Sequence, residues 1–144
     1  MVDKREKQAS VIMHCYQCQR PRVVVVDELE SESDAMAAIH CRRRGVRLIA
    51  GMTGSLSSLM DDANFSSLVG GLSMSEAGTR PTTQPVFDAI VELKWGALNE
   101  WRVITDTTAA VDSILNNHNY HAQLRIRDPE TGSIQIESER VYIG

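Results

Sequence analysis

One short stretch decides the expected fold: Val23-Val24-Val25-Val26-Asp27-Glu28. Four β-branched apolar residues in succession, closed by two acids, predict a strand that is buried on both faces, as is typical of parallel sheets. A second apolar strand is predicted over 46–50. The segment between them predicts a helix that begins at Ser31 or Ser33 and ends at Gly45. Strand, helix and strand with short links indicate a βαβ unit.

The flanking sequence adds further elements. A helix is predicted over 3–19, and Pro21 ends it. The Ser-, Thr-, Gly- and Pro-rich segment 73–85 is expected to form a long loop. The remaining elements are strands over 86–93 and 101–105, a helix capped by Asp106 or Thr107, and a β-hairpin of strands 122–127 and 133–137. The expected fold class is α/β, with a small, mainly parallel sheet flanked by helices. One domain is expected over 1–117, and the hairpin over 118–144 extends the same domain.

The composition excludes several classes of protein. The chain has 144 residues and a formal net charge of −4, with 42% hydrophobic and 24% charged residues, which suits one domain with an ordinary core. No apolar run approaches the ~20 residues that span a bilayer, so no membrane span is expected. The acidic balance argues against nucleic-acid binding over the whole surface. Three cysteines and an N-terminus without a signal peptide favour a reducing compartment, either the cytoplasm or an organelle.

Asp27 and Glu28 are the leading candidates for chemistry. In P-loop nucleoside triphosphatases an apolar strand ends in an Asp that orients the metal shell of the nucleotide, and the following Glu polarises the attacking water. Such carboxylates lie at the carboxyl end of a buried strand, where a doubly wound sheet opens its crevice. Acidic residues also end many strands without any catalytic role, so the pair alone leaves a structural role open.

Several further segments carry a specific resemblance. They keep one order along the chain: 23–29, 34–38, 44–50, Gly54 with Leu56 and Leu59, 67–72, 85–92, 101–103 and 110–115. Over residues 8–117 the chain resembles the second half of the stage III sporulation protein AA family, above all its cyanobacterial, algal and plant plastid members, which are P-loop ATPases. The resemblance implies a partial P-loop ATPase fold of the RecA/AAA-like kind. It also makes Asp27 and Glu28 the family-matched catalytic positions and suggests an organelle such as a plastid.

The chain departs from this family where the nucleotide would bind. It contains no Gly-x-x-x-x-Gly-Lys-Ser/Thr loop, which the family carries upstream of the acidic strand and whose backbone N–H groups and Lys cradle phosphates. The family's Thr-Ala-His-Gly-like run corresponds to Gly51-Met52-Thr53-Gly54, so Thr53 and Gly54 are expected near a nucleotide without the family's polar pair. We therefore expect no ATP hydrolysis by the chain alone and no cofactor. Mg-ATP is expected only if a partner supplies the phosphate-binding loop.

Three functions follow as hypotheses. The leading one is a catalytically silent, partial P-loop ATPase-like protein that serves as a structural or interaction subunit of a larger assembly. Its sheet lacks the strand that carries the phosphate loop, beside the strand 46–50. A strand from another chain, the strand that contains Phe87 or a large protein partner is expected to cover an open edge of this kind. The first alternative is one half of a split or oligomeric ATPase whose phosphate-binding loop lies on another chain. The second is an RNA-contacting accessory protein that uses clustered arginines.

Two side-chain clusters carry the remaining hypotheses. The arginine cluster could contact RNA or another polyanion, act across an interface, or form a solvated helix end; it consists of Arg42, Arg43, Arg44 and Arg47. A C-x-x-C pair and a His-Cys pair could offer four zinc ligands, Cys15, Cys18, His40 and Cys41. Cys on the apolar face of a helix is more often a small core residue, so no metal is expected. Trp95 and Trp101 flank a turn and are expected to pack within strands, with a stacking platform as the alternative.

Overall fold

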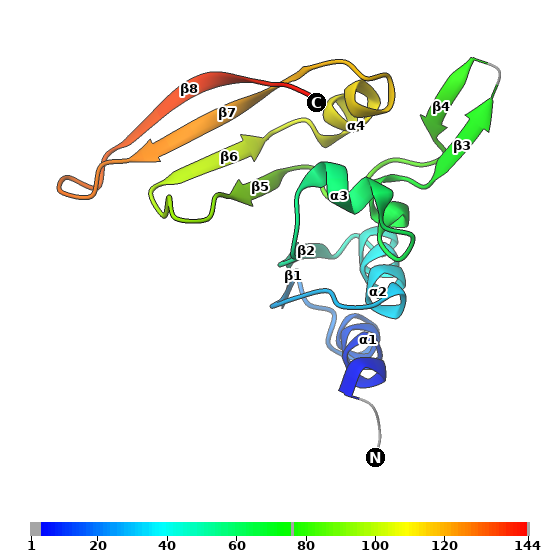
Figure 1. The fold of residues 1–144 in the computed structure, drawn as a ribbon. Helices are drawn as coiled ribbons and strands as arrows, with labels where there is room; N and C mark the ends of the chain where they lie inside the picture. The colour runs from blue at the N-terminus through cyan, green and yellow to red at the C-terminus, as the bar shows by residue number, and fades with distance from the viewer. Residues whose placement is uncertain (1–3, 76, 144) are drawn as a thin grey trace. The chain divides into compact units, whose positions relative to one another are not determined.

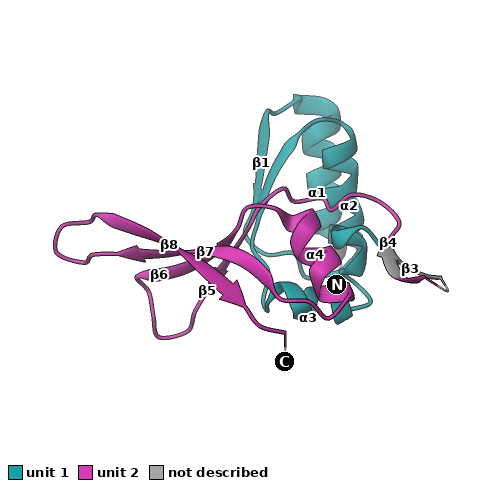
Figure 2. Cartoon of the chain, turned by 90° about the horizontal axis from the view of Figure 1, so that it is seen from above, with its two compact units in different colours: residues 1–71 teal, residues 72–144 magenta. Residues whose placement is uncertain are grey.

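The chain is a mixed α/β protein that folds as two compact units. The computed structural model describes residues 4–75 and 77–143. One unit covers residues 1–71 and the other covers residues 72–144 (Figure 2). Within the described residues, every sheet lies inside one of the two units. The sequence analysis did not place a boundary at this point.

In its described residues the first unit contains three α-helices, a π-helical turn, a 3-10 turn and a short parallel sheet. A π-helical turn follows α1, and a 3-10 turn follows α3. In chain order the elements are α1 (Lys4–His14), the π-helical turn (Cys15–Gln19), β1 (Val23–Val26), α2 (Glu32–Arg43), β2 (Arg47–Ala50), α3 (Leu56–Asp61) and the 3-10 turn (Ser66–Val69) (Figure 1). α3 and the short turns are additional to the βαβ unit and complete its packing.

The predicted βαβ unit is confirmed. β1 and β2 are parallel and in register from Val23 opposite Arg47 to Val26 opposite Ala50. Ser31 is the N-cap of α2, because its hydroxyl accepts a hydrogen bond from the Asp34 backbone N–H at 3.2 Å. Gly45 follows the helix with φ of +75°, a conformation that glycine adopts without strain. The local signals in the sequence therefore set the bounds of this unit correctly.

The core of the first unit is built on the small-residue face of α2. Ala35, Ala38 and Cys41 are fully buried, and α2 packs against α1 and against the 3-10 turn. The larger buried side chains around this face are Ile12, Tyr16, Leu29, Leu56, Met60, Leu68 and Val69. Small residues allow the backbones to approach closely, so α1 and α2 pack tightly.

The expectation that β1 is buried on both faces is wrong. Only Val26 of this strand is buried. Val25 is 72% exposed and Val23 is 43% exposed, and Ile49 of β2 is 61% exposed. We call these three residues the open face of the β1–β2 sheet. Helices cover the opposite face alone, whereas parallel sheets are normally covered on both.

The second unit is built on antiparallel strands. Its elements are β3 (Leu72–Ser75), β4 (Gly78–Pro81), β5 (Ile90–Leu93), β6 (Glu100–Ile104), α4 (Thr107–Leu115), β7 (Tyr120–Arg127) and β8 (Ile134–Val141) (Figure 1). β3 and β4 form a two-stranded hairpin, and the other strands form a four-stranded sheet in the order β5-β6-β7-β8. Every pair in this sheet is antiparallel.

This unit corrects three expectations. The sheet structure is not mainly parallel, because β1 and β2 are the single parallel pair among the described strands. The segment 73–85 is not a plain loop, because it carries most of the β3–β4 hairpin. The strand expected over 86–93 is shorter and begins at Ile90. Hydrophobic periodicity locates strands but does not reveal which strands pair, and this explains the error in the sheet.

The helix and hairpin of the second unit match the sequence. Asp106 caps α4 by accepting a hydrogen bond from the Ala109 N–H at 3.0 Å. The predicted hairpin is formed by β7 and β8, with a turn through Asp128. α4 packs on β7, and the buried residues here are Ile104, Ala110, Val111, Tyr120 and Ala122. The C-terminal hairpin is therefore half of the four-stranded sheet.

Candidate functional site

The predicted acidic residues lie at the carboxyl end of β1. Asp27 and Glu28 follow the last strand residue, Val26, and both are exposed. The Thr53 hydroxyl donates a hydrogen bond to the Glu28 carboxylate at 2.7 Å. The structure thus brings together two residues, 25 positions apart, that the sequence analysis placed independently near a nucleotide.

Backbone contacts fix the two segments that carry these residues. The Gly51 N–H donates to the Val26 carbonyl at 3.2 Å, and the Leu29 N–H donates to the Gly51 carbonyl at 3.0 Å. A Cβ atom on Gly51 would overlap the Asp27 carbonyl oxygen. Only glycine therefore allows this approach of the two strand ends.

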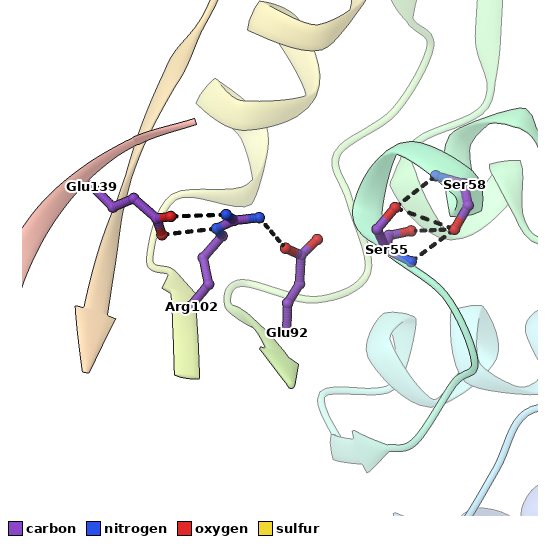
Figure 3. Close-up of polar contacts among 5 residues, drawn as sticks. All are labelled: Ser55, Ser58, Glu92, Arg102 and Glu139. Carbon is purple, nitrogen blue, oxygen red and sulfur yellow. Dashed lines mark hydrogen bonds and ion pairs between the residues drawn. The ribbon is translucent and has the colours of Figure 1, made fainter. Parts of the chain in front are cut away.

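The loop that carries Thr53 ends in a capped helix (Figure 3). Gly54 has φ of +121°, and a Cβ there would collide with the Ser58 hydroxyl. Ser55 is the N-cap of α3: its hydroxyl accepts from the Ser58 N–H at 3.3 Å, and the Ser58 hydroxyl accepts from the Ser55 N–H at 2.8 Å. This reciprocal pair is a capping box. Gly54 therefore has a structural role in the turn before α3.

The buried carboxylate of Asp34 stabilises the segment that follows β1. Asp34 is 1% exposed, and its Oδ2 accepts hydrogen bonds from the Glu30 N–H at 2.9 Å and from Gln8 Nε2 at 3.1 Å. Gln8 Nε2 also donates to the Glu28 carbonyl at 2.6 Å. Asp34 thereby ties α1 to the segment that holds Glu28. The sequence analysis missed this role, and an acid in the first turn of α2 was the one sign of it.

The four arginines lie away from the acidic pair. Arg42 and Arg43 end α2, Arg44 is its C-cap, and Arg47 begins β2. β1 and β2 are parallel, so the start of β2 and the end of β1 lie at opposite ends of the sheet, about 13 Å apart for four residues. All four side chains are exposed. Within this unit the arginines do not approach the candidate nucleotide site.

The four candidate zinc ligands lie within the described residues and are not arranged as a metal site. Cys41 is fully buried, Cys15 is half-buried and Cys18 is exposed, with its Sγ 3.6 Å from His14 Nδ1. Among the described residues, no group of three or more His, Cys, Asp or Glu side chains is arranged to hold a metal ion. Core packing fits Cys41, and burial raises the pKa of its thiol, with a smaller contribution from Cys15. Core packing does not fit Cys18.

The second unit holds an ionic network that the sequence analysis missed (Figure 3). Arg102 on β6 donates two hydrogen bonds to Glu139 on β8, from Nε at 2.9 Å and from Nη2 at 2.8 Å. Its Nη1 donates to Glu92 on β5 at 3.0 Å. The hydrogen bonds to Glu139 raise the pKa of Arg102, and the same contact lowers the pKa of Glu139. The alternation of charged residues along these strands was the available signal, but their pairing depends on strand order.

Comparison with known proteins gives two distant relatives. The chain is 27% identical over 138 residues to a protein of Cyanidium caldarium described as "Uncharacterized protein ycf45", and equally to a protein of Porphyra purpurea with the same description. Each match covers 86% of this chain, but 41% of the first protein and 24% of the second. The chain therefore spans less than half the length of these curated relatives. No model of a known protein family matches, and no solved structure matches.

The structure also tests whether a helix could span a membrane. In the described part of the chain, no helix has the length and apolar character that crossing a membrane requires.

Proposed function

We propose that this chain is a catalytically silent, P-loop ATPase-like protein that works as an interaction subunit of a larger assembly. The observation that carries the proposal is the open face of the β1–β2 sheet, with Val25 at 72% and Ile49 at 61% exposure. A parallel sheet is stable when both faces are covered and its edges are paired. A second polypeptide segment that packs on this face would bury the valines and the isoleucine.

The groups at the end of β1 support the proposed lack of activity. Asp27 and Glu28 are carboxylates of the kind that Mg²⁺ prefers, but they are exposed, and the described residues form no cluster that could hold a metal. The sequence contains no Gly-Lys-Ser/Thr loop to cradle phosphates. These residues alone therefore do not fit Mg-ATP.

The second candidate is half of a split ATPase, and the Glu28–Thr53 hydrogen bond favours it. The two segments that would face a nucleotide are held together at 2.7 Å and remain open to solvent. A phosphate-binding loop from another polypeptide could complete a site at this edge. In that case Asp27 would serve the metal shell and Glu28 would orient water.

One experiment tests whether a protein partner binds through the open face. The complex from the native source is sized by light scattering, and its members are identified by mass spectrometry. The variant Val25→Lys is compared with Val11→Lys, which makes the same substitution at an exposed position of α1. We expect Val25→Lys to release the partner and Val11→Lys to retain it. A chain that is monomeric in its native extract contradicts the proposal.

An activity assay separates the two candidates. Phosphate release from Mg-ATP is measured for the isolated chain and for the complex, each with and without Glu28→Gln. The absence of phosphate release from both preparations supports the interaction subunit. Hydrolysis by the complex that Glu28→Gln abolishes, with a Gly-Lys-Ser/Thr loop on the partner, supports the split enzyme. Hydrolysis by the isolated chain that Glu28→Gln abolishes refutes the leading proposal.

A plastid is the compartment that this proposal favours, with the cytoplasm as the alternative. The two relatives come from red algae, which are organisms with plastids. The three cysteines are free thiols, which agrees with a reducing environment.

A further inference from the structure

The four-stranded sheet sorts its side chains into two chemically different faces. Residues directly opposite each other in an antiparallel pair point to the same side, and neighbours along a strand point to opposite sides. The register pairs Glu92 with Arg102, and Arg102 with Leu124. These residues therefore share a face with Glu139, as their hydrogen bonds confirm (Figure 3). We call this the acidic face, and the opposite one the basic face.

The basic face carries cations, aromatic rings and aliphatic side chains. One row crosses all four strands, because Leu93 pairs with Trp101, Trp101 with Arg125 and Arg125 with Ile136. The neighbouring rows place Arg127 opposite Ile134 and His121 opposite Arg140 on the same side. The members of the basic face are Val91, Leu93, Trp101, Val103, His121, Gln123, Arg125, Arg127, Ile134, Ile136, Ser138 and Arg140.

Charge is segregated between the two faces. Within the described strands β5–β8, all the carboxylates lie on the acidic face: Glu92, Glu100, Glu137 and Glu139. The basic face has three arginines on its strands and no acid there. The acidic face also carries Arg102, so the basic face alone has charges of one sign, in a chain whose formal net charge is −4.

Much of the basic face is exposed along its outer strands β5 and β8, whereas Val103 on β6 is buried. Leu93 is 74% exposed, Ile136 is 57% exposed and Val91 is 56% exposed. Tyr142, just beyond β8, is 73% exposed, and the Arg140 guanidinium lies over its ring at 5.6 Å. These exposed apolar side chains lie on the two outer strands of the sheet, with Trp101 and Arg125 between them.

We propose that the basic face binds single-stranded nucleic acid. Extended single strands offer phosphates to arginines and unstacked bases to aromatic and aliphatic side chains, and a four-stranded sheet can display two or three bases in this way. In a duplex the bases are stacked and paired, so Leu93 and Ile136 would contact the charged phosphate backbone instead of bases. An acidic peptide would satisfy the arginines but would give Trp101 and Tyr142 no planar partner.

The geometry of the side chains supports this ligand. Gln123 Oε1 accepts hydrogen bonds from Arg125 Nε at 3.2 Å and from Nη2 at 2.8 Å. The contact fixes the Arg125 guanidinium, whose cross-strand neighbour is Trp101, and leaves other N–H groups of its five for phosphate oxygens. Trp95, in the turn between β5 and β6, is fully exposed rather than packed as expected and supplies a further ring in the same unit.

The site is independent of the acidic strand end and of the arginines on α2, because it lies wholly in residues 90–142. Binding is measured by fluorescence anisotropy with a labelled 12-nucleotide single-stranded RNA, the same sequence as DNA, and the RNA duplex. We expect both single strands to bind at least tenfold more tightly than the duplex. With three arginines, the slope of the logarithm of the association constant against the logarithm of the salt concentration is expected to be about −2. Each phosphate contact on a single strand contributes about −0.7 to this slope.

Variants locate the binding on the basic face. Arg127→Ala is expected to reduce the salt slope by about 0.7, and Tyr142→Ala is expected to weaken binding by about tenfold through lost stacking. Both side chains are exposed, so the fold should tolerate these changes. Arg43→Ala and Arg44→Ala remove the same charge from the end of α2 and are expected to have little effect.

Several outcomes would overturn the proposal. They are the absence of binding at 50 mM salt, binding of the duplex as tight as that of the single strands, and equal losses in the basic-face and α2 variants. Competition by a polyglutamate peptide at the same charge concentration would instead indicate an acidic protein ligand and would also overturn it. A preference for RNA over DNA would identify contacts to the 2′-hydroxyl and is compatible with the proposal.

Discussion

The contribution of the Arg102 network to the free energy of unfolding can be measured with Arg102→Met, which keeps an unbranched, flexible side chain and removes the guanidinium. The variant loses three charge-assisted hydrogen bonds, two to Glu139 and one to Glu92. The carboxylate side chains are 26% and 14% exposed, and that of Arg102 is 34% exposed. Fully exposed pairs contribute ~0–1 kcal/mol, and breaking a buried pair costs ~3–5 kcal/mol. This partly buried network lies between these limits, so we expect a loss of about 2 kcal/mol in the free energy of unfolding.

Urea unfolding followed by tryptophan fluorescence is the direct assay. Trp95 and Trp101 are the two tryptophans of the chain and both belong to the second unit, so their emission reports on the unit that contains the network. Glu137→Gln is the matched control, because Glu137 lies on β8 and is exposed. A loss below about 0.5 kcal/mol, or one equal to that of Glu137→Gln, would show that solvent screens the network as it does surface pairs.

The effect of Arg102→Met should depend on pH with a defined sign. The hydrogen bond from Arg102 lowers the folded-state pKa of Glu139 below its ordinary value of 4.5. A carboxyl whose pKa is lower in the folded state binds more protons when unfolded, so its stabilisation is present above pH 4.5 and is lost as the pH falls below it. The difference between wild type and Arg102→Met is therefore constant near neutral pH and shrinks below about 4.5. A difference that grows with acidification would refute the assignment.

Three further predictions concern the first unit. Gly51→Ala forces a Cβ into the Asp27 carbonyl, and we expect it to destabilise this unit by at least about 2 kcal/mol in urea unfolding followed by circular dichroism; a neutral effect would show that the strand ends can separate freely. Ser55→Ala removes the cap of α3 and should cost about 1 kcal/mol in the same assay, whereas Ser55→Asp should restore most of that loss. Cys41 is buried and its thiol pKa is raised, so iodoacetamide should label it last among the three cysteines, as read by peptide mass spectrometry; early labelling of Cys41 would contradict its place in the core.

Local physics explains what could be predicted about the fold. The β-branched run of β1, the Ser31 and Asp106 caps and the Gly45 stop act within a few residues, so the βαβ unit and α4 followed from the sequence. The alternating apolar residues of β7 and β8, joined by a short turn, predicted the C-terminal hairpin. Each of these signals depends on spacing along the chain alone.

The candidate site was partly predictable for the same reason. Asp27 and Glu28 could be placed at a strand end, whereas Thr53 was placed near a nucleotide only through the resemblance of its segment to a known family. Their contact could not be derived, because it requires the close approach of Gly51 to the Asp27 backbone. Asp34 was visible as a residue of the first helical turn, but its contacts with Gln8 depend on the packing of α1 against α2.

The sequence by itself determined the local elements, their caps and the acidic end of β1. Tertiary structure alone decided that β5 and β6 join the C-terminal hairpin in one antiparallel sheet and that Arg102 bridges Glu92 and Glu139. It also decided that Arg125, Arg127 and Arg140 share a face free of acids on its strands. The physical reason is register. Helices and turns close within a few residues, whereas the neighbours of a strand are chosen by pairings between distant segments that no local pattern encodes.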